Sequence, residues 1–173
     1  MEQKNQYPTQ QKLIFETIGF VHSEHKQVDS IPVQPVYANG CHGRAEILPE
    51  YEKGLCDLEG FSHIYLIYYF HQAGSAQLIV RPFLEDRTHG VFSTRSPRRP
   101  NPIGLSLVRL LKRQQNILYL DDVDILDGTP IIDIKPYISR FDHRENTRDG
   151  WQEEVDEDTA SRRGARGYKK KDK

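Results

Sequence analysis

The stretch FSHIYLIYYF, residues 61–70, decides the fold class of this chain. Aromatic and β-branched side chains dominate it, and such side chains pack well on the pleated surface of a sheet. The run is much shorter than the ~18 apolar residues that a membrane-spanning helix needs. It therefore predicts a strand that is buried on both faces.

Shorter segments of the same character lie on both sides of this strand. Residues 103–111 and 117–125 are separated by the turn 113–116 and predict a hairpin. Residues 50–58 predict a short helical turn. The other expected strands are residues 13–22, 43–48, 78–82, 90–94 and 129–134. Many short strands without a long amphipathic helix predict an all-β fold, a small barrel or a sandwich with short helical turns.

The length of 173 residues suits one domain with a real core. We expect a disordered lead-in at residues 1–12, a barrel domain at residues 13–141 and a charged, polar C-terminal tail at residues 142–173. Apolar residues become rare in this tail, and Trp151 is the exception. No secretory signal opens the chain, so the expected location is the cytoplasm, with Cys41 and Cys56 as free thiols.

Charge is unevenly distributed although the net charge is only −1. Residues 81–113 contain eight Arg or Lys against two acidic residues, residues 151–158 are acidic, and residues 162–173 are basic again. Because the last segment has few apolar anchors, we expect it to be mobile and to contact phosphates. An ordinary solvated surface with a solubilising tail is the alternative interpretation.

The segment TRSPRRPNPIG, residues 94–104, combines three prolines with several arginines. Its stiffness suits a preorganised site. Arg95, Arg98 and Arg99 can each grip a carboxylate or phosphate through paired hydrogen bonds. A surface turn whose arginines face water is the competing interpretation.

Two further segments carry candidate polar groups. In LDGTPIIDIKPY, residues 126–137, Asp127 and Gly128 indicate a turn, and Asp133 alternates with isoleucines in the strand that follows. His71 and Gln72 leave the long strand and could hydrogen-bond a heterocycle or simply cap the strand end. No metal site is predicted, because Cys41-His42, Cys56 and His63 lack the close ligand spacing of zinc sites. Phosphate-loop and dinucleotide-binding signatures are also absent from the sequence.

Taken together, the segments GFSHIYLIYYFHQ, GVFSTRSPRRPNPIGLS and DILDGTPIIDIKPY resemble the TrmO family of tRNA methyltransferases. The resemblance runs from about Leu13 to Phe141. It implies a small β-barrel that forms homodimers with S-adenosylmethionine near the interface. It also implies methylation of the exocyclic amine of threonylcarbamoyl-adenosine, next to the anticodon of tRNA.

The resemblance also implies the site residues. From the chemistry of the stiff basic loop rather than from the resemblance, we expect Arg98 and Arg99 to face RNA and Arg95 to be the partner of the cofactor's carboxylate. The implied cofactor-binding residues are Pro32, Gln34, His71, Gln72, Arg95, Leu105, Asp127, Gly128, Thr129 and Pro130. Many members of the family have Pro-Arg-Gln where this chain has Pro32-Val33-Gln34. Some also carry a C-terminal domain that we expect to be absent here, where the basic tail would substitute for it.

Methyl transfer from a sulfonium is a direct displacement, so alignment supplies much of the acceleration. Asn101, held between two prolines, is the candidate acceptor of hydrogen bonds from the adenine amine, and Asp133 or Asp127 is the candidate base. Three alternatives stay open: a module that binds S-adenosylmethionine without chemistry, a methyltransferase for another acceptor, and an RNA-binding barrel without a cofactor.

Overall fold

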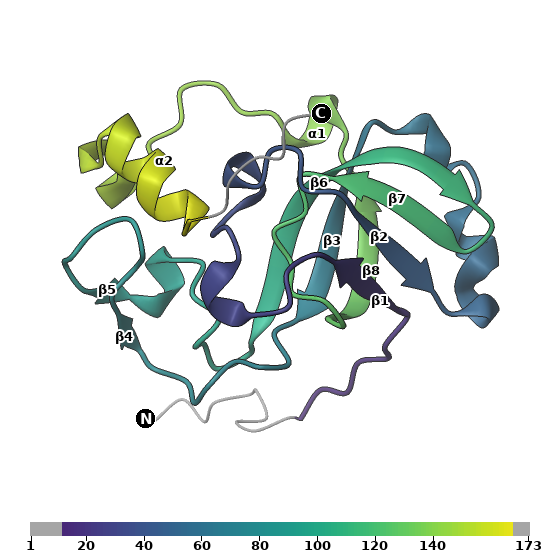
Figure 1. Cartoon of the computed structure of the whole chain (residues 1–173), viewed down its shortest axis with the longest axis horizontal. Helices are drawn as coiled ribbons and strands as arrows, with labels where there is room; N and C mark the ends of the chain where they lie inside the picture. The colour runs from purple at the N-terminus through teal and green to yellow at the C-terminus, as the bar shows by residue number, and fades with distance from the viewer. Residues whose placement is uncertain (1–11, 168–173) are drawn as a thin grey trace, which may run out of the picture.

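The computed structural model describes residues 12–167, so nearly all of the predicted lead-in and residues 168–173 of the predicted tail lie outside the described residues. The described chain has two parts along its longest axis. A barrel occupies one side, and the small β4–β5 sheet with helix α2 occupies the other (Figure 1).

The barrel is closed and antiparallel, in the strand order β1-β2-β7-β6-β3-β8. Closure leaves no sheet edge unpaired, which is how small all-β proteins avoid edge-to-edge aggregation. The prediction of a small all-β barrel is confirmed. Its strands are β1 (Gly19–Ser23), β2 (Gly43–Ile47), β3 (His63–Tyr69), β6 (Ile103–Gln114), β7 (Ile117–Asp121) and β8 (Pro130–Pro136).

The core fills the inside of this barrel with alternate residues of each strand, as the period of two along a strand requires. Ile64 and Leu66 of β3 are fully buried there. The expectation that β3 is buried on both faces is wrong, because its other face forms the outer wall, where Tyr65 and Ile67 are half-buried and Tyr69 is exposed.

A glycine lets one aromatic ring enter the core. The ring of Tyr68 lies over Gly104 of β6, where a Cβ atom would come within 2.2 Å of the ring. Gly104 is thus required by the close approach of a side chain to the backbone.

The predicted β6–β7 hairpin is confirmed, with Gln114 paired to Ile117. Gln115 adopts a left-handed conformation in its turn, with φ of 54°. The second strand is shorter than the expected 117–125, because Asp122 has φ of 61° and turns the chain away after Asp121. The predicted strand 13–22 likewise begins only at Gly19, where pairing with β2 starts.

Short elements connect the barrel strands. Strands β4 (Ile79–Val80) and β5 (His89–Gly90) pair with one another outside the barrel. The predicted helical turn at residues 50–58 is confirmed as the 3₁₀ helix η3 (Pro49–Leu55). A strand at residues 90–94 is wrong, because η5 (Val91–Ser93) is a 3₁₀ helix. Three further 3₁₀ helices lie between the barrel strands: η1 (Val28–Ser30), η2 (Pro35–Tyr37) and η4 (Leu58–Gly60).

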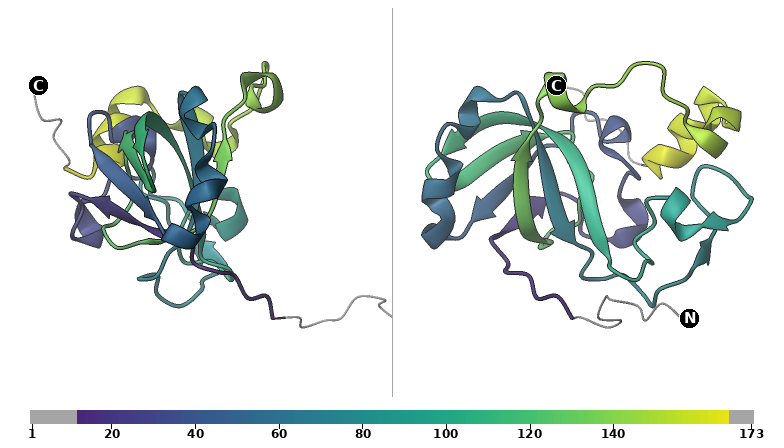
Figure 2. Two further views of the ribbon diagram at one scale, coloured as in Figure 1. Left: turned by 90° about the vertical axis from the view of Figure 1, so that its right-hand side faces the viewer. Right: turned by 180° about the vertical axis from the view of Figure 1, so that it is seen from behind.

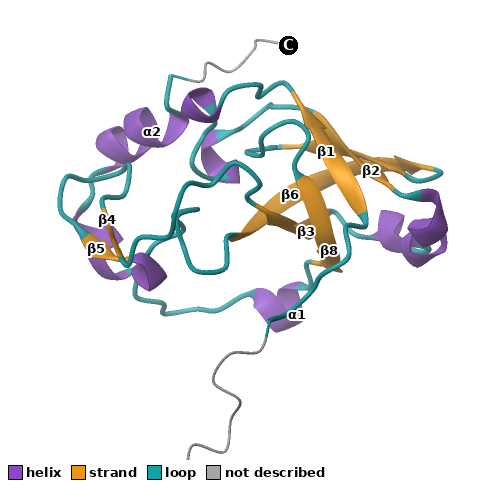
Figure 3. Cartoon of the chain, turned by 90° about the horizontal axis from the view of Figure 1, so that it is seen from below, coloured by secondary structure: helices purple, strands orange, loops and turns teal. Residues whose placement is uncertain are grey.

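After the barrel the chain forms α1 (Ser139–Asp142), the 3₁₀ helix η6 (Gly150–Glu154) and α2 (Glu157–Ala165). Helix α2 includes residues 162–165, where we expected a mobile segment from Arg162 onward. The Asp156 side chain accepts a hydrogen bond from the amide of Thr159 and caps α2. Acidic residues in its first turn and arginines in its last turn complement the helix dipole. Figures 2 and 3 show α2 beside the β4–β5 excursion, away from the barrel wall.

Candidate functional site

Antiparallel pairing brings four chain segments to one end of the barrel. Tyr69, at the end of β3, pairs with Ile103, at the start of β6. The start of β8 pairs with the end of β3 and with β1. The loops after β1 and β3 and those before β6 and β8 therefore share this end. They carry all of the implied cofactor-binding residues except Leu105 and Pro130, which lie in strands β6 and β8.

Gln34 and Arg95 meet directly at this end. The Arg95 guanidinium donates a hydrogen bond to Oε1 of Gln34, whose own amide donates to the carbonyl of Val33 at 2.6 Å. Pro32, just before them, is buried. The guanidinium is exposed and has donors left for an anionic ligand.

The loop that holds Arg95 is stiffened by short-range hydrogen bonds. The amide of Ser96 donates to Oγ1 of Thr94 at 3.2 Å, and the amide of Arg98 donates to Oγ of Ser96 at 3.3 Å. The Arg98 side chain contacts Oε1 of Gln77 at 3.3 Å. The stiffness expected from the prolines is therefore reinforced, and Arg98 lies against the loop that follows β3.

The turn before β8 is fastened to the end of β1. Oδ1 of Asp127 accepts a hydrogen bond from the amide of Ser23 at 3.0 Å, and its Oδ2 pairs with Nζ of Lys26 at 2.7 Å. Burial alone would raise the pKa of Asp127, but these two hydrogen bonds outweigh it and hold that pKa below its ordinary value. Asp127 is thus a poor proton acceptor at neutral pH. Gly128 has φ of 77°, which only glycine adopts without strain.

Thr129 and Pro130 complete this turn with little freedom. Thr129 is buried, and its hydroxyl donates to the carbonyl of Leu126 at 2.7 Å. Pro130 begins β8 opposite Phe20. The two residues therefore shape the backbone of the turn.

His71 and Gln72 extend from the end of β3 with exposed side chains, 3.5 Å apart between Nε2 atoms. Their exposure is compatible with contact to a ligand, and the role of these two side chains stays a prediction. Leu105 instead lies on the outer wall of β6, with 45% of its surface exposed.

The candidate acceptor residues lie on different elements. Asn101 is exposed in the loop before β6. Its backbone carbonyl accepts a hydrogen bond from the amide of Ile103 at 2.7 Å. Asp133 lies on β8, in register with Ile67 of β3, which pairs in turn with Leu105. Its carboxylate pairs with Nζ of Lys135 at 2.7 Å. Asp133 is thus in the same cross-strand row as Leu105, with Ile67 between them.

Sequence reasoning missed a polar chain inside the barrel. The Ser106 hydroxyl donates to Oδ1 of Asp124 at 2.6 Å and lies 3.0 Å from the Tyr68 hydroxyl. Because Ser106 gives its proton to Asp124, Tyr68 is the donor to Ser106. Burial raises the pKa of Asp124 to about 7, against the opposing hydrogen bond from Ser106, and burial also raises the pKa of Tyr68. An acidic residue two positions after Asp122 carries no pattern that would have marked it as buried.

Residues 12–167 contain neither a cluster of metal-ligating side chains nor a membrane-spanning helix. No three His, Cys, Asp or Glu side chains gather there closely enough to hold a metal ion, and Cys41 of the weighed cluster contacts His25 instead. Neither Cys41 nor Cys56 forms a disulfide in the described residues. No helix in this part of the chain is long and apolar enough to cross a membrane.

The fold and the site define a class: a closed antiparallel barrel whose polar site is built from loops at one end. Residues 20–143 match the family model of the tRNA-methyltransferase O N-terminal domain, and the chain belongs to this family. A crystal structure of TrmO superposes with a TM-score of 0.70 at 39% identity over 81% of this chain.

Curated relatives agree with this assignment. A probable S-adenosyl-L-methionine-binding protein of Pyrococcus abyssi is 52% identical over 141 residues, which cover 82% of this chain and 77% of the relative. The tRNA (adenine(37)-N6)-methyltransferase of Escherichia coli is 39% identical over 134 residues, 72% of this chain. The chain spans only 57% of the E. coli protein and 64% of the crystallised TrmO chain.

Proposed function

We propose that this protein transfers a methyl group from S-adenosylmethionine to the exocyclic amine of adenine 37 of tRNA, the position named for its E. coli relative. The observation that carries the proposal is the direct contact of Arg95 with Gln34 at the barrel end where the Asp127 turn also lies. Segments far apart in the sequence are held there in one polar rim, and they are the segments that the family resemblance assigns to the cofactor. Threonylcarbamoyl-adenosine is the proposed form of the acceptor.

The residues of the rim fit such a cofactor by their chemistry. The free donors of Arg95 suit a carboxylate, through charged and bidentate hydrogen bonds. His71 and Gln72 offer hydrogen bonds to a heterocycle, and the backbone of the Asp127–Pro130 turn offers further polar groups. When bound, S-adenosylmethionine supplies an electrophilic methyl group.

The acceptor amine must be held in line with that methyl group. We assign this task to Asn101, whose side-chain carbonyl can accept hydrogen bonds from the amine. Asp133 is the proposed proton acceptor, because its half-exposed carboxylate can meet a bound ligand. Arg98 and Arg99 are proposed to contact RNA phosphates near the site.

A homodimer is proposed through the outer wall of β3, β6 and β8. Leu105, Ile67 and Tyr69 form an apolar strip there that would be covered by the same strip of a second copy, as a two-fold interface requires. Leu105 would then reach the cofactor from this interface. Leu105→Glu is expected to give monomers in sedimentation velocity runs, and a dimer that persists would refute this arrangement.

Because the proposed substrate is tRNA, the cytoplasm is the proposed location of the protein.

The test of the function combines purified protein, radiolabelled S-adenosylmethionine and tRNA that carries threonylcarbamoyl-adenosine. We expect label in the modified nucleoside, identified by mass spectrometry after digestion. Unmodified tRNA is the matched control for the acceptor. Cofactor binding without transfer to either tRNA would support the second candidate, a binding module, which the name of the Pyrococcus relative favours.

A further inference from the structure

The C-terminal segment, residues 150–166, lies outside the matched family domain, which ends at residue 143. None of its side chains belongs to the barrel core. It contacts instead the two segments that bring Gln34 and Arg95 to the barrel end: the Pro32 loop (residues 24–42) and the Arg95 segment (residues 81–96).

Its contact with the Pro32 loop is close. The amide of Val33 donates to the carbonyl of Gly164 in α2 at 2.9 Å. Gly164 is buried, and a Cβ atom there would come within 2.5 Å of the Tyr37 ring. The helix thus approaches the loop so closely that only glycine fits, one residue away from Gln34.

Its contact with the Arg95 segment uses both aromatic and charged groups. Trp151 donates its indole N–H to the carbonyl of Ser93 at 2.8 Å and stacks on His89, with ring centroids 4.9 Å apart. Ser93 lies two residues before Arg95. This contact places the C-terminal segment next to Arg95, the second residue of the Gln34–Arg95 pair.

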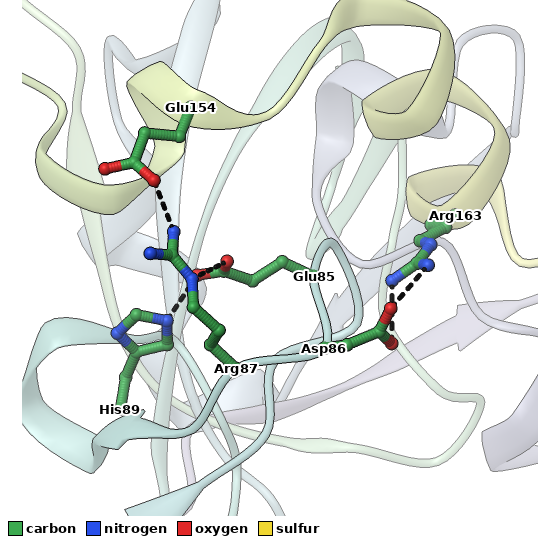
Figure 4. A network of polar contacts seen from close by, with 6 residues as sticks. All are labelled: Glu85, Asp86, Arg87, His89, Glu154 and Arg163. Atoms are coloured by element: carbon green, nitrogen blue, oxygen red, sulfur yellow. Dashed lines mark hydrogen bonds and ion pairs between the residues drawn. The ribbon is translucent and has the colours of Figure 1, made fainter.

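Two ion pairs extend this contact, as Figure 4 shows. Arg163 reaches both carboxylate oxygens of Asp86 at 3.2 and 3.1 Å. Arg87 pairs with Glu154 at 2.6 Å and also with Glu85, which pairs with His89. The hydrogen bond from Arg163 lowers the pKa of Asp86.

Arg166 joins the two segments directly. It donates to the carbonyl of Val28 at 2.9 Å, and its guanidinium lies over the Phe83 ring, 4.2 Å from the centroid. Val28 belongs to the Pro32 loop and Phe83 to the Arg95 segment. One side chain therefore spans both.

We infer that the C-terminal segment is a positioning element that holds Gln34 and Arg95 in their cofactor-binding geometry. The inference rests on the proposed function. Loops that carry a site usually have low local stability, and a ligand must then supply the free energy that orders them. Here the ordering is supplied in advance by a segment that touches no reacting group, so Gly164 and Trp151 are positioning residues.

Gly164→Val tests the inference, with Ser161→Val on the exposed face of the same helix as the matched control. If the loops are competent only about a tenth of the time in Gly164→Val, the Kd for S-adenosylmethionine rises about tenfold. KM for the cofactor should rise equally, with kcat at saturating cofactor unchanged. The amide of Val33 should lose its protection from hydrogen exchange, while the melting temperature of the barrel stays close to that of the unsubstituted protein.

Reversing the charges of the Asp86–Arg163 ion pair gives an independent test of the inference. Asp86→Arg and Arg163→Asp should each weaken cofactor binding by about threefold, since exposed ion pairs are weak, and the double exchange should restore it. Unchanged Val33 exchange and cofactor affinity in Gly164→Val would overturn the inference, as would faster exchange with unchanged affinity. If the unsubstituted protein fails to bind S-adenosylmethionine, the proposed function fails, and the exchange data still decide whether the segment orders the loop.

Discussion

Arg95 donates a hydrogen bond to Gln34 across 61 positions of sequence, and this contact joins the loop after β1 to the loop before β6. Neither strand pairs with the other in the barrel. The contact therefore depends on loops and on the segment packed behind them.

Arg95→Ala should weaken binding of S-adenosylmethionine. A hydrogen bond to a charged group contributes about 1.5–3 kcal/mol, which corresponds to a ten- to hundredfold rise in Kd. Isothermal titration calorimetry measures the change. Arg98→Ala is the control, because Arg98 contacts Gln77 and we assign it to RNA, so its Kd for the cofactor should not change. An unaltered Kd in Arg95→Ala would assign this arginine to RNA or solvent.

Replacing both Arg98 and Arg99 by alanine should reduce turnover on tRNA more than it reduces tRNA affinity. Both lie in a stiff loop beside the proposed methyl donor, so their loss misaligns the acceptor, and displacement is sensitive to alignment. Single-turnover rates at saturating tRNA, compared with Kd from filter binding, separate the two effects. A fall in affinity alone would make them simple phosphate contacts.

Much of this fold could be predicted from period-two patterns, because a strand with one face in a barrel core alternates. Residues 61–70 were recognised instead by their run of aromatic and β-branched side chains, which is why their alternate burial was not expected, and the hairpin at β6–β7 was recognised by its turn. Helix α2 was missed because it docks through Gly164 and arginines rather than through an apolar face. The polar composition of residues 142–173 does not reveal such docking.

The candidate site was predictable only in part, for a similar physical reason. Short motifs mark loops rich in proline, glycine and arginine, and barrel closure brought those loops together. The burial of Asp124 depends instead on the turn at Asp122, which directs the following residues inward. Local sequence does not encode that direction.

Removing residues 168–173, YKKKDK, tests the expectation that the basic end of the chain contacts tRNA phosphates. This deletion leaves α2 and its contacts intact, so cofactor affinity should not change. Each lost phosphate contact lowers the slope of log Kd against log salt by about 0.7–0.9. Salt titrations of tRNA binding measure it, and an equal slope before and after deletion would leave the end of the chain with a role in solubility alone.

Asp124 should make the protein less stable as pH rises through the acidic range. Its pKa is about 7 in the folded protein, against 3.8 for an aspartate that is free in solvent, so between these values the unfolded chain releases a proton that the folded one keeps. The free energy of unfolding is therefore highest below the unfolded pKa and falls with pH by up to about 1.4 kcal/mol per unit until the folded pKa is reached. Asp124→Asn cannot titrate but still accepts from Ser106, so its stability should depend less on pH in this window.

Urea denaturation at intervals from pH 4.5 to pH 8, about the span over which such a group titrates, measures this contribution. Asp133→Asn is the matched control, since Asp133 is half-exposed and pairs with Lys135, and it should retain the pH dependence of the unsubstituted protein. Parallel curves for the unsubstituted protein and Asp124→Asn would mean that Asp124 is ionised when folded. The chain from Tyr68 through Ser106 would then end on a buried negative charge, which Arg95 at the barrel end is placed to attract.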